Sequence, residues 1–419
     1  MDRRAPLMFL MLTVFLAASG LGLHALASQP GKGDAMPDAT LIVAADPHYI
    51  APALTDHGAY YRDMIGSSDG KVMEYIEELT EAFLAEVISR HPDALILAGD
   101  LTFNGARESH EALAEKLRAV SAAGIPVLVI PGNHDLENRN AARFHGDGFT
   151  RVDSVTAGGF AEIYRDCGYA QARARDGASL SYVVDINPKL RILMLDVNTS
   201  DSPNRVKEET LIWAEAQLRD AAAAGAKVVA VSHQNVYKHN SVIYAGYVME
   251  NADELLALYE KHGVLLNLSG HLHCQHIARD DGGFYEIATS SLAVNPCQYG
   301  VIEVSEGHLA YDAVPVDVAA WAAARGLTDP NLLSFAEYAR DFFTGSGRTV
   351  IDESDPDAAA LKRFFGELNL AYFAGRLDLI DPQDPMFDRW TDAFGFEGQY
   401  ILAIRDEAGL DSTHLALTY

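Results

Sequence analysis

The stretch ALILAGD, residues 94–100, joins a short apolar run directly to a glycine and a carboxylate. The same order recurs in PVLVIPGNHD, residues 126–135, where the apolar run leads into a glycine, a carboxamide, an imidazole and a carboxylate. Apolar runs of this length, rich in aliphatic and β-branched residues, are typical of buried strands. The two stretches therefore predict strands of an α/β fold whose polar residues lie at the carboxyl end of a sheet.

Three further polar strings follow predicted strands in the same way. The string DPH (46–48) follows the apolar run 41–45, SH (232–233) follows 227–231, and GHLH (270–273) follows 264–268. Because ligand sites of open α/β sheets lie outside the carboxyl ends of the strands, the donor side chains of all five strings are expected to converge. These seven donors are Asp46, His48, Asp100, Asn133, His233, His271 and His273.

The types of these side chains indicate a metal site. Carboxylate, imidazole and carboxamide groups are ligands for divalent transition metals, whereas a soft thiolate site would need cysteines. Seven donors are too many for one ion. If Asp100 bridges, Asp46, His48 and His273 can complete one site, and Asn133, His233 and His271 a second. Ions sharing a carboxylate lie ~3.5–4 Å apart, which stabilises both the attacking and the leaving oxygen of an in-line displacement, so phosphoester hydrolysis is expected.

In these five strings the chain resembles the calcineurin-like metallophosphoesterase superfamily, whose pattern is D-x-H, G-D, G-N-H-[DE], H and G-H-x-H. The resemblance implies a four-layer α/β/β/α sandwich in which the seven donors hold two divalent ions, and Mn, Fe and Zn all suit such mixed ligands. It also implies that His134, beside a ligand, contacts the phosphate and assists the leaving group. A hydroxide bridging the two metals would attack phosphorus.

Residues 99–105 narrow the resemblance. The protein-phosphatase branch reads G-D-x-x-D-R-G here, whereas this chain reads GDLTFNG, with Asn104 in place of the arginine that grips phosphate. The string is similar to that of bacterial class III cyclic-nucleotide phosphodiesterases, including secreted relatives with a helical C-terminal extension. A neutral carboxamide suits a singly charged diester better than a dianionic monoester, so phosphodiesters are expected, with cyclic nucleotides as leading candidates. Asn104 is equally well explained as a turn residue.

Two other functions stay open. One is a phosphomonoesterase or nucleotidase of the same fold, and the other is a catalytically silent, metal-bearing protein that binds a surface partner. His134 argues against the second, because a purely structural metal site does not need this extra imidazole. Besides Asn104, the candidate substrate contacts are Arg143 and His239, which lie in loops after the motif strands, although each also fits an ordinary surface residue.

Charge limits the partners. The 419 residues include 59 acidic and 32 basic side chains, which gives a formal charge of −27. Such an acidic surface repels polyanions, so a small phosphoester is the expected partner and a nucleic acid polymer is not. The hydrophobic content of 49% is sufficient for a large core. Neither the physiological substrate nor the oligomeric state follows from these features.

Four segments are predicted along the chain. Residues 1–27 begin with Arg3 and Arg4, continue through an apolar stretch and end in Ala-Leu-Ala, which is typical of a secretory signal peptide. A secreted or cell-envelope protein without stable membrane insertion is therefore expected, and an uncut N-terminal anchor is the alternative. Residues 28–39 form a flexible lead-in, 40–316 the metallophosphoesterase domain, and 317–419 a small helical domain punctuated by glycines and prolines.

Three cysteines follow the predicted signal peptide, namely Cys167, Cys274 and Cys297. An odd number in an exported chain means at least one free thiol or an intermolecular bond. Cys274 directly follows a predicted ligand, but harder donors already complete both sites. We therefore expect Cys274 to be a buried residue that does not bind metal.

Overall fold

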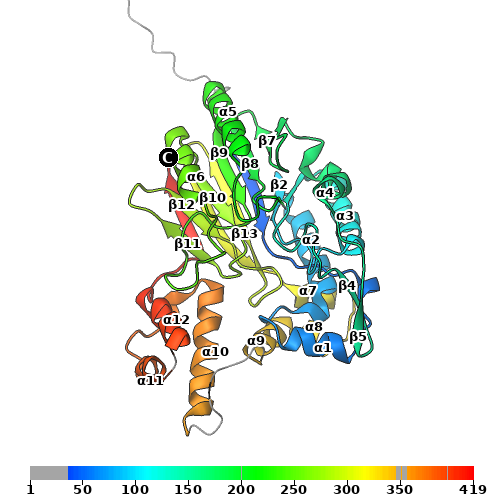
Figure 1. The fold of residues 1–419 in the computed structure, drawn as a ribbon, viewed down its shortest axis with the longest axis vertical. Helices are drawn as coiled ribbons and strands as arrows, with labels where there is room; N and C mark the ends of the chain where they lie inside the picture. Colours follow the sequence, from blue (N-terminus) through cyan, green and yellow to red (C-terminus); the bar gives the residue numbers. More distant parts are fainter. Residues whose placement is uncertain (1–35, 200, 346–350, 352–355, 394) are drawn as a thin grey trace, which may run out of the picture. The chain divides into compact units, whose positions relative to one another are not determined.

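The structure, a computed structural model, describes residues 36–199, 201–345, 351, 356–393 and 395–419. The predicted signal peptide and most of the predicted lead-in lie outside these residues. Residues Met36–Tyr419 form one compact unit that is built around two β-sheets (Figure 1). None of the helices in the described part of the chain combines the length and the apolar character needed to cross a bilayer.

The first sheet has the strand order β15-β14-β13-β1-β2-β3. Its strands are β1 (Ala39–Ala44), β2 (Ala94–Ala98), β3 (Val127–Ile130), β13 (Gln298–Ser305), β14 (His308–Pro315) and β15 (His414–Thr418). β1, β2 and β3 pair in parallel, whereas β13, β14 and β15 continue the sheet in antiparallel fashion. Strand β15 differs from the prediction of helices alone after residue 317, because the short alternation of Leu415 and Leu417 is a weak strand signal.

The second sheet has the order β11-β12-β10-β9-β8-β7-β6. Its strands are β6 (Ala174–Arg175), β7 (Tyr182–Asn187), β8 (Leu190–Leu195), β9 (Lys227–Ser232), β10 (Leu266–Ser269), β11 (His276–Arg279) and β12 (Tyr285–Ala288). β8, β9, β10 and β12 are parallel to their neighbours in this group, and the remaining pairs are antiparallel. The parallel strands of both sheets therefore present their carboxyl ends to the loops that carry the predicted donors.

Strand β8 shows why the sheets form layers. Successive side chains of a strand point to opposite faces, and Ile192 and Met194 pack into the core between the sheets while Leu193 and Leu195 pack into a second core. Helices α2 (Ile76–Arg90) and α3 (Arg107–Ala122) contribute to the first core, and α5 (Glu208–Ala224) and α6 (Ala252–His262) to the second (Figure 1). Each fully buried aliphatic side chain contributes about 1.5–3 kcal/mol. The predicted α/β/β/α layering is confirmed.

A small β-hairpin and short helices surround this core. The hairpin consists of β4 (Ala142–His145) and β5 (Gly148–Arg151), and it contacts α1 (Ala59–Gly66). Other short elements are α4 (Ala157–Ile163), the turns Pro52–Leu54, Met73–Tyr75 and Leu377–Leu379, and a π-helical turn Arg165–Tyr169. The sequence did not predict the hairpin, because its burial alternates only in β4 and β5 is largely exposed.

The C-terminal region is mainly helical, as predicted. Its helices are α7 (Val318–Ala324), α8 (Pro330–Leu333), α9 (Phe335–Gly345), α10 (Ala358–Ala374), α11 (Met386–Ala393) and α12 (Gly395–Asp406). The Asp317 and Asp329 side chains accept backbone N–H groups at the starts of α7 and α8, which is the usual role of an N-cap residue. All three cysteines are buried and free.

Candidate metal centre

The loops after five parallel strands supply the seven predicted donors. Asp46 and His48 follow β1, Asp100 follows β2, and Asn133 follows β3, so the first sheet provides the carboxylates and the carboxamide. The loops after β9 and β10 of the second sheet provide His233, His271 and His273. The candidate centre therefore lies where the carboxyl ends of the two sheets meet.

Most of these donors have strained backbones. Five of the seven occupy the left-handed region, with φ angles of 51° at Asp46, 45° at His48, 46° at Asp100, 66° at His271 and 63° at His273. A residue with a side chain adopts this conformation at a cost of about 1–3 kcal/mol, so surrounding contacts must hold it in place. The strain turns short loops sharply, which brings side chains from neighbouring strands together.

Two glycines allow the donor loops to approach one another. A Cβ atom at Gly132 would lie 2.2 Å from the Asp100 backbone nitrogen, and one at Gly270 would lie 2.5 Å from Asp46 Oδ2. Any larger residue would push these loops apart. The glycines of the GNHD and GHLH strings are therefore needed for the geometry of the centre rather than for its chemistry.

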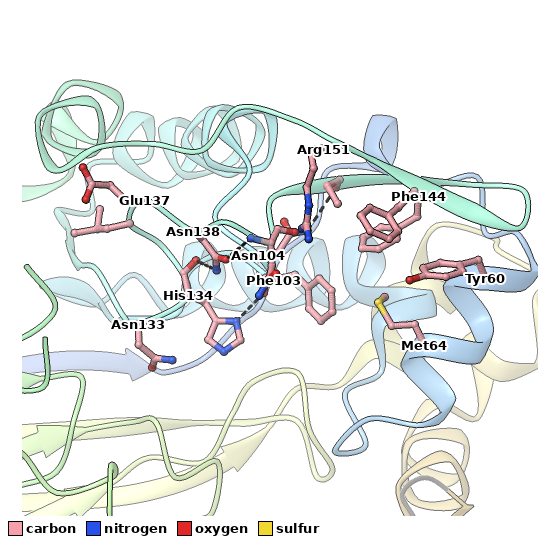
Figure 2. Close-up of a pocket in the computed structure, with 14 residues that line it drawn as sticks. Tyr60, Met64, Phe103, Asn104, Asn133, His134, Glu137, Asn138, Phe144 and Arg151 are labelled. Atoms are coloured by element: carbon pink, nitrogen blue, oxygen red, sulfur yellow. Dashed lines mark hydrogen bonds between the residues drawn. The ribbon is translucent and has the colours of Figure 1, made fainter. Parts of the chain in front are cut away.

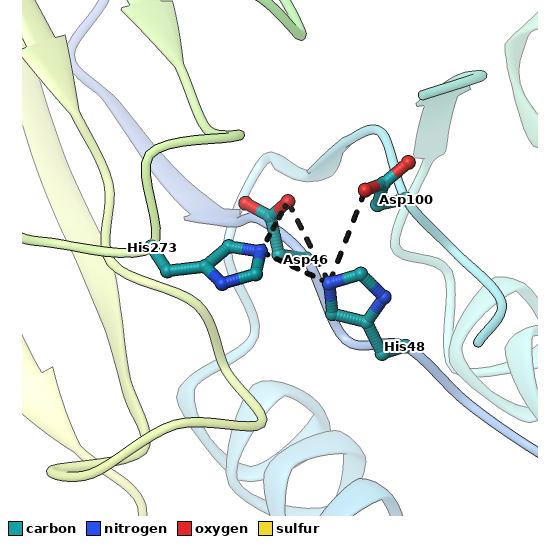
Figure 3. Close-up of side chains that lie close together, drawn as sticks. All are labelled: Asp46, His48, Asp100 and His273. Atoms are coloured by element: carbon teal, nitrogen blue, oxygen red, sulfur yellow. Dashed lines mark hydrogen bonds and ion pairs between the residues drawn. The ribbon is translucent and has the colours of Figure 1, made fainter. Parts of the chain in front are cut away.

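The first donor group consists of Asp46, His48, Asp100 and His273. Figure 3 shows the two imidazoles and the two carboxylates directed toward one point. His48 Nε2 lies 3.1 Å from His273 Nε2, 4.0 Å from Asp46 Oδ1 and 3.9 Å from Asp100 Oδ2. His273 Nε2 lies 3.5 Å from Asp46 Oδ1. Four ligand atoms this close together can surround a single cation.

The hydrogen bonds of this group leave its lone pairs free for a cation. Asp69 Oδ2 lies 3.2 Å from His273 Nδ1 and accepts its hydrogen, so His273 Nε2 carries a lone pair toward the centre. Asp46 Oδ2 accepts the His271 backbone N–H at 2.9 Å. Asp46 Oδ1 is buried and has no hydrogen-bond partner among the described residues. A buried carboxylate oxygen without a donor is costly, and a divalent ion would satisfy it.

The second donor group shares Asp100 and adds His233 and His271. His233 Nδ1 donates to the Ala98 carbonyl at 2.9 Å, so Nε2 faces inward, 3.5 Å from Asp100 Oδ1 and 3.0 Å from Asn133 Oδ1. His271 Nε2 donates to the Gly246 carbonyl at 3.1 Å, which leaves Nδ1 free. The residues therefore fit two ions with Asp100 in common, the division that was expected if Asp100 bridges.

Burial and neighbouring charges shift the pKa values of the donors in both directions. Burial, assisted by Lys71, lowers the pKa of His48 well below its usual value, and burial together with His233 lowers the pKa of His271 to about 4. Burial alone would raise the pKa of Asp100, but His233 and His134 hold it well below its usual value. Neutral imidazoles and an ionised carboxylate are the ligand forms of these groups. Against the effect of burial, Asp100 raises the pKa of His233 to about 9, and Asp46 raises that of His273, so a cation would have to displace a proton from these two rings.

His134 lies beside the donor groups without belonging to either. Its Nδ1 donates to the Phe103 carbonyl at 2.8 Å, and its Nε2 lies 3.8 Å from Asp100 Oδ2. Its side chain is 37% exposed, whereas the Asp100 side chain is 1% exposed. Its backbone N–H donates to Asp100 Oδ1 at 2.7 Å. The ring is thus fixed in orientation, with one nitrogen available to a bound molecule.

A supporting role for Asp135 emerges from its hydrogen bonds. Its carboxylate accepts the backbone N–H groups of Leu101, Thr102 and Gly132, all at 2.9 Å. These bonds tie the loop after β2 to the loop after β3. Asp135 therefore positions Asp100 and Asn133 relative to each other, a role that the sequence did not predict for it.

A cavity of about 640 Å³ opens next to His134. Its aromatic wall comes from α1, the loop after β2 and the hairpin, with Tyr60, Phe103, Phe144 and Phe149. Figure 2 shows Asn133 and His134 at one end of the cavity and Tyr60 at the other. Arg151, whose guanidinium carbon lies 4.9 Å from the centre of the Phe149 ring, adds a positive charge to the lining.

The predicted substrate contacts are placed differently from one another. Asn104 lines the cavity, and its Nδ2 donates to the carbonyls of Asn140 and Ala142 at 3.2 and 3.4 Å. Arg143 instead forms a two-pronged pair with Glu108, at 3.0 Å to each oxygen, and does not line the cavity.

His239 is 2% exposed, and its ring nitrogens face Glu286 and His276 at 3.0 and 2.9 Å. The structure therefore does not bring His239 to a position where it could contact a substrate. The sequence missed the lining residues Tyr60, Phe149 and Arg151, because exposed aromatic and basic residues carry no spacing signal.

Two family comparisons cover most of the chain. Residues 39–275 match the calcineurin-like phosphoesterase family, and residues 317–411 match a C-terminal domain of cyclic nucleotide phosphodiesterase. The first match includes all five polar strings up to His273, and the second includes all of the C-terminal helices.

Individual relatives match only part of this chain, and the chain spans less than two thirds of the length of the two curated relatives given next. The chain is 29% identical over 187 residues to a probable glycerophosphodiester phosphodiesterase GpdQ of Arcobacter nitrofigilis, a match to 43% of this chain and 57% of that protein. It is 37% identical over 76 residues to a probable cyclic nucleotide phosphodiesterase of Vesicomyosocius okutanii, a match to 17% of this chain and 31% of that protein. A dimetal phosphatase structure from Danio rerio aligns with a TM-score of 0.48 at 14% identity, covering 66% of this chain and 95% of that one.

Proposed function

The chain belongs to the calcineurin-like phosphoesterase family, and on this premise we propose that it hydrolyses phosphodiesters at a binuclear metal centre. The observation that carries the proposal is the pair of donor groups that share Asp100 beside a cavity lined by His134. When bound, two divalent transition-metal ions, with Mn, Fe and Zn as candidates, supply positive charge to the phosphoester and make hydroxide available near neutral pH.

The chain's own residues position the phosphoester and manage one proton. Asp100 lies between the two donor groups, so a phosphate held there lies next to His134 Nε2. The Phe103 carbonyl keeps a hydrogen on His134 Nδ1. When both ring nitrogens carry a hydrogen, Nε2–H gives its proton to the departing ester oxygen, and Nδ1–H remains hydrogen-bonded to the Phe103 carbonyl. This proton transfer is general acid catalysis.

The preference for a diester rests on the surroundings of His134. Asn104 occupies the position at which the protein-phosphatase branch has an arginine that binds the phosphate. Its Nδ2 group donates to backbone carbonyls, and the neutral side chain brings no charge to the phosphate. The adjacent cavity has room for the second esterified group, which a diester has and a monoester lacks. The two relatives named above are both described as phosphodiesterases, and these descriptions support the same choice.

The aromatic wall of the cavity favours a planar ester group. The Tyr60 ring lies 5.7 Å from the Phe149 ring and 6.3 Å from the Phe144 ring, and Tyr60 and Phe149 are exposed to solvent. Nucleobases stack on such side chains, whereas a glycerol group has no π-face that could stack. Cyclic nucleotides are therefore the leading candidate substrates.

Export through the N-terminal signal peptide is also part of this proposal. It predicts a mature chain that begins at Ser28, and N-terminal sequencing of the exported protein would test it.

A substrate panel at matched metal loading tests the function. Cyclic nucleotides, bis(nitrophenyl) phosphate, glycerophosphodiesters and simple monoesters would be compared with the wild-type protein and the variants Phe149→Ala and Tyr60→Ala. We expect diesters to exceed monoesters and each variant to raise KM for cyclic nucleotides roughly tenfold through lost stacking. Ile212→Ala, an exposed position on α5, is the control. Monoesters turning over much faster than every diester would contradict the proposal.

A further inference from the structure

The C-terminal helices contact the loop that carries two predicted metal ligands. This loop, residues 270–275, follows β10 and leads into β11. Figure 1 shows α10 and α12 beneath the end of the second sheet. His271 belongs to one donor group and His273 to the other, so the position of this single loop affects both candidate metal sites.

Side chains that alternate with the ligands point into the C-terminal helices. Leu272 is 7% exposed and Cys274 is 1% exposed, and among the described residues they are the two buried members of the C-terminal hydrophobic cluster that come from outside residues 351–404. Tyr372 on α10 belongs to the same cluster as Cys274, and its hydroxyl donates to the His239 carbonyl at 3.5 Å. The cluster includes Leu361, Leu368 and Tyr372 of α10, Phe387 of α11, and Tyr400 and Ile401 of α12.

Backbone contacts fix the end of the same loop. The Gln275 N–H donates to the Phe373 carbonyl at 3.1 Å, and Gln275 Nε2 donates to the Ser412 carbonyl at 2.9 Å. Gly375, which ends α10 with a φ of 74°, lies so close that a Cβ there would be 2.9 Å from the Gln275 carbonyl oxygen. The loop therefore docks on the C-terminal region through both its backbone and its side chains.

A second contact reaches His273 through Asp69. The Phe343 ring on α9 packs against Gly70, where a Cβ would lie 2.6 Å from the ring. Gly70 joins Asp69, which accepts the His273 Nδ1 hydrogen, to Lys71, which pairs with Asp69. Because Phe343 also contacts Phe373, with ring centres 5.0 Å apart, α9 and α10 support this segment together.

We propose that the C-terminal helices act as a clamp that holds His271 and His273 in the geometry that binds metal. The proposal rests on the binuclear centre proposed above and assigns Leu272 and Tyr372 as positioning residues. Both histidines have positive φ angles, 66° and 63°, so the loop needs external contacts to keep its conformation. Groups that orient ligands commonly change metal affinity by about 10–100-fold.

Metal affinity tests the clamp in the full-length protein. Zn²⁺ dissociation constants would be measured by chelator competition for Leu272→Ala, Tyr372→Ala and the control Phe387→Ala, together with thermal unfolding of each metal-free protein. Phe387 belongs to the same cluster and is 1% exposed, but its ring packs on Phe364 at 5.0 Å. We expect the clamp variants to bind both ions at least about tenfold more weakly. The control Phe387→Ala should bind both ions as tightly as the wild type does, even if its thermal stability falls by as much as that of the clamp variants.

Two results would overturn the clamp: unchanged affinity in the clamp variants, or an equal loss in Phe387→Ala at matched stability. Amide exchange gives a readout without metal, and residues 270–275 should exchange faster in the metal-free clamp variants than in the control. If Tyr372→Ala does not fold, Leu272→Ala alone decides. A wild type that binds two ions and follows this pattern, yet hydrolyses no diester, would leave the clamp standing and refute the phosphodiesterase proposal.

Discussion

At the residue scale, Asp100 is the side chain on which both donor groups depend. It is common to the two groups, whereas Asn133 Oδ1 lies 3.0 Å from Nε2 of His233, a member of the second group. We therefore expect Asp100→Ala to lose both metal ions and Asn133→Ala to weaken one of them. Elemental analysis of the two variants after identical dialysis measures the difference. The same metal content in both would show that Asp100 is not shared.

His134 provides a separate test of the chemistry, because it contacts the centre without being one of the donors. His134→Ala should fold, keep two metal ions and lose roughly 10²–10⁴ in kcat, the usual effect of removing a general acid. His308→Ala, in the exposed start of β14, is the matched control. A variant whose metal content collapses would make His134 a ligand instead.

The ligands could be foreseen from sequence because each comes within four residues of the end of a buried strand, and the sheet geometry brings those strand ends together. Sequence could not show whether Arg143 and His239 are available to a substrate. Whether Arg143 or His239 is free depends on Glu108 and Glu286, and only the folded chain shows that each is paired with that carboxylate. Asp69 was missed for the same reason, because its partner His273 lies about 200 residues away in the sequence.

At the element scale, helix α3 carries a buried histidine with a predictable effect on stability. His110 is fully buried, accepts the Tyr164 hydroxyl hydrogen at Nδ1, 3.0 Å away, and donates from Nε2 to the Asp135 carbonyl. Burial lowers its pKa to about 3. Between that value and the unfolded pKa of about 6.5, the unfolded chain binds a proton that the folded chain does not.

The free energy of unfolding should therefore fall as the pH drops from about 6.5 toward 3, with a contribution from His110 of up to about 1.4 kcal/mol per pH unit. Denaturant titrations between pH 4 and 7 on the wild type and His110→Gln would measure this contribution as the difference between the two slopes. His91→Gln, at the exposed end of α2, is the control. Identical slopes in the wild type and His110→Gln would contradict the assignment.

The hairpin β4–β5 shows why the cavity could not be predicted at this scale. Its strands have four residues each, and β5 alternates poorly because most of it is exposed. Only its packing against α1 places Phe144 and Phe149 beside Tyr60. The long buried strands were predictable because burial on both faces requires continuous apolar runs.

At the scale of the whole molecule, three parts of the chain meet at one centre. The first sheet supplies Asp46, His48, Asp100 and Asn133, the second supplies three histidines, and the C-terminal helices support the loop of two of them. The loop of these two histidines lies at the end of the first family match, and the helices that contact it belong to the second. The strongly acidic composition, −27 overall, further favours binding of cations over polyanions.

The metal content of the purified full-length protein tests the central claim most directly. Elemental analysis after removal of loosely bound ions should find two transition-metal ions per chain, because the two donor groups share one carboxylate and each can complete the surroundings of one ion. Circular dichroism on the same sample would verify that the protein is folded. One ion or none per folded chain would contradict the binuclear centre and the phosphodiester hydrolysis that depends on it.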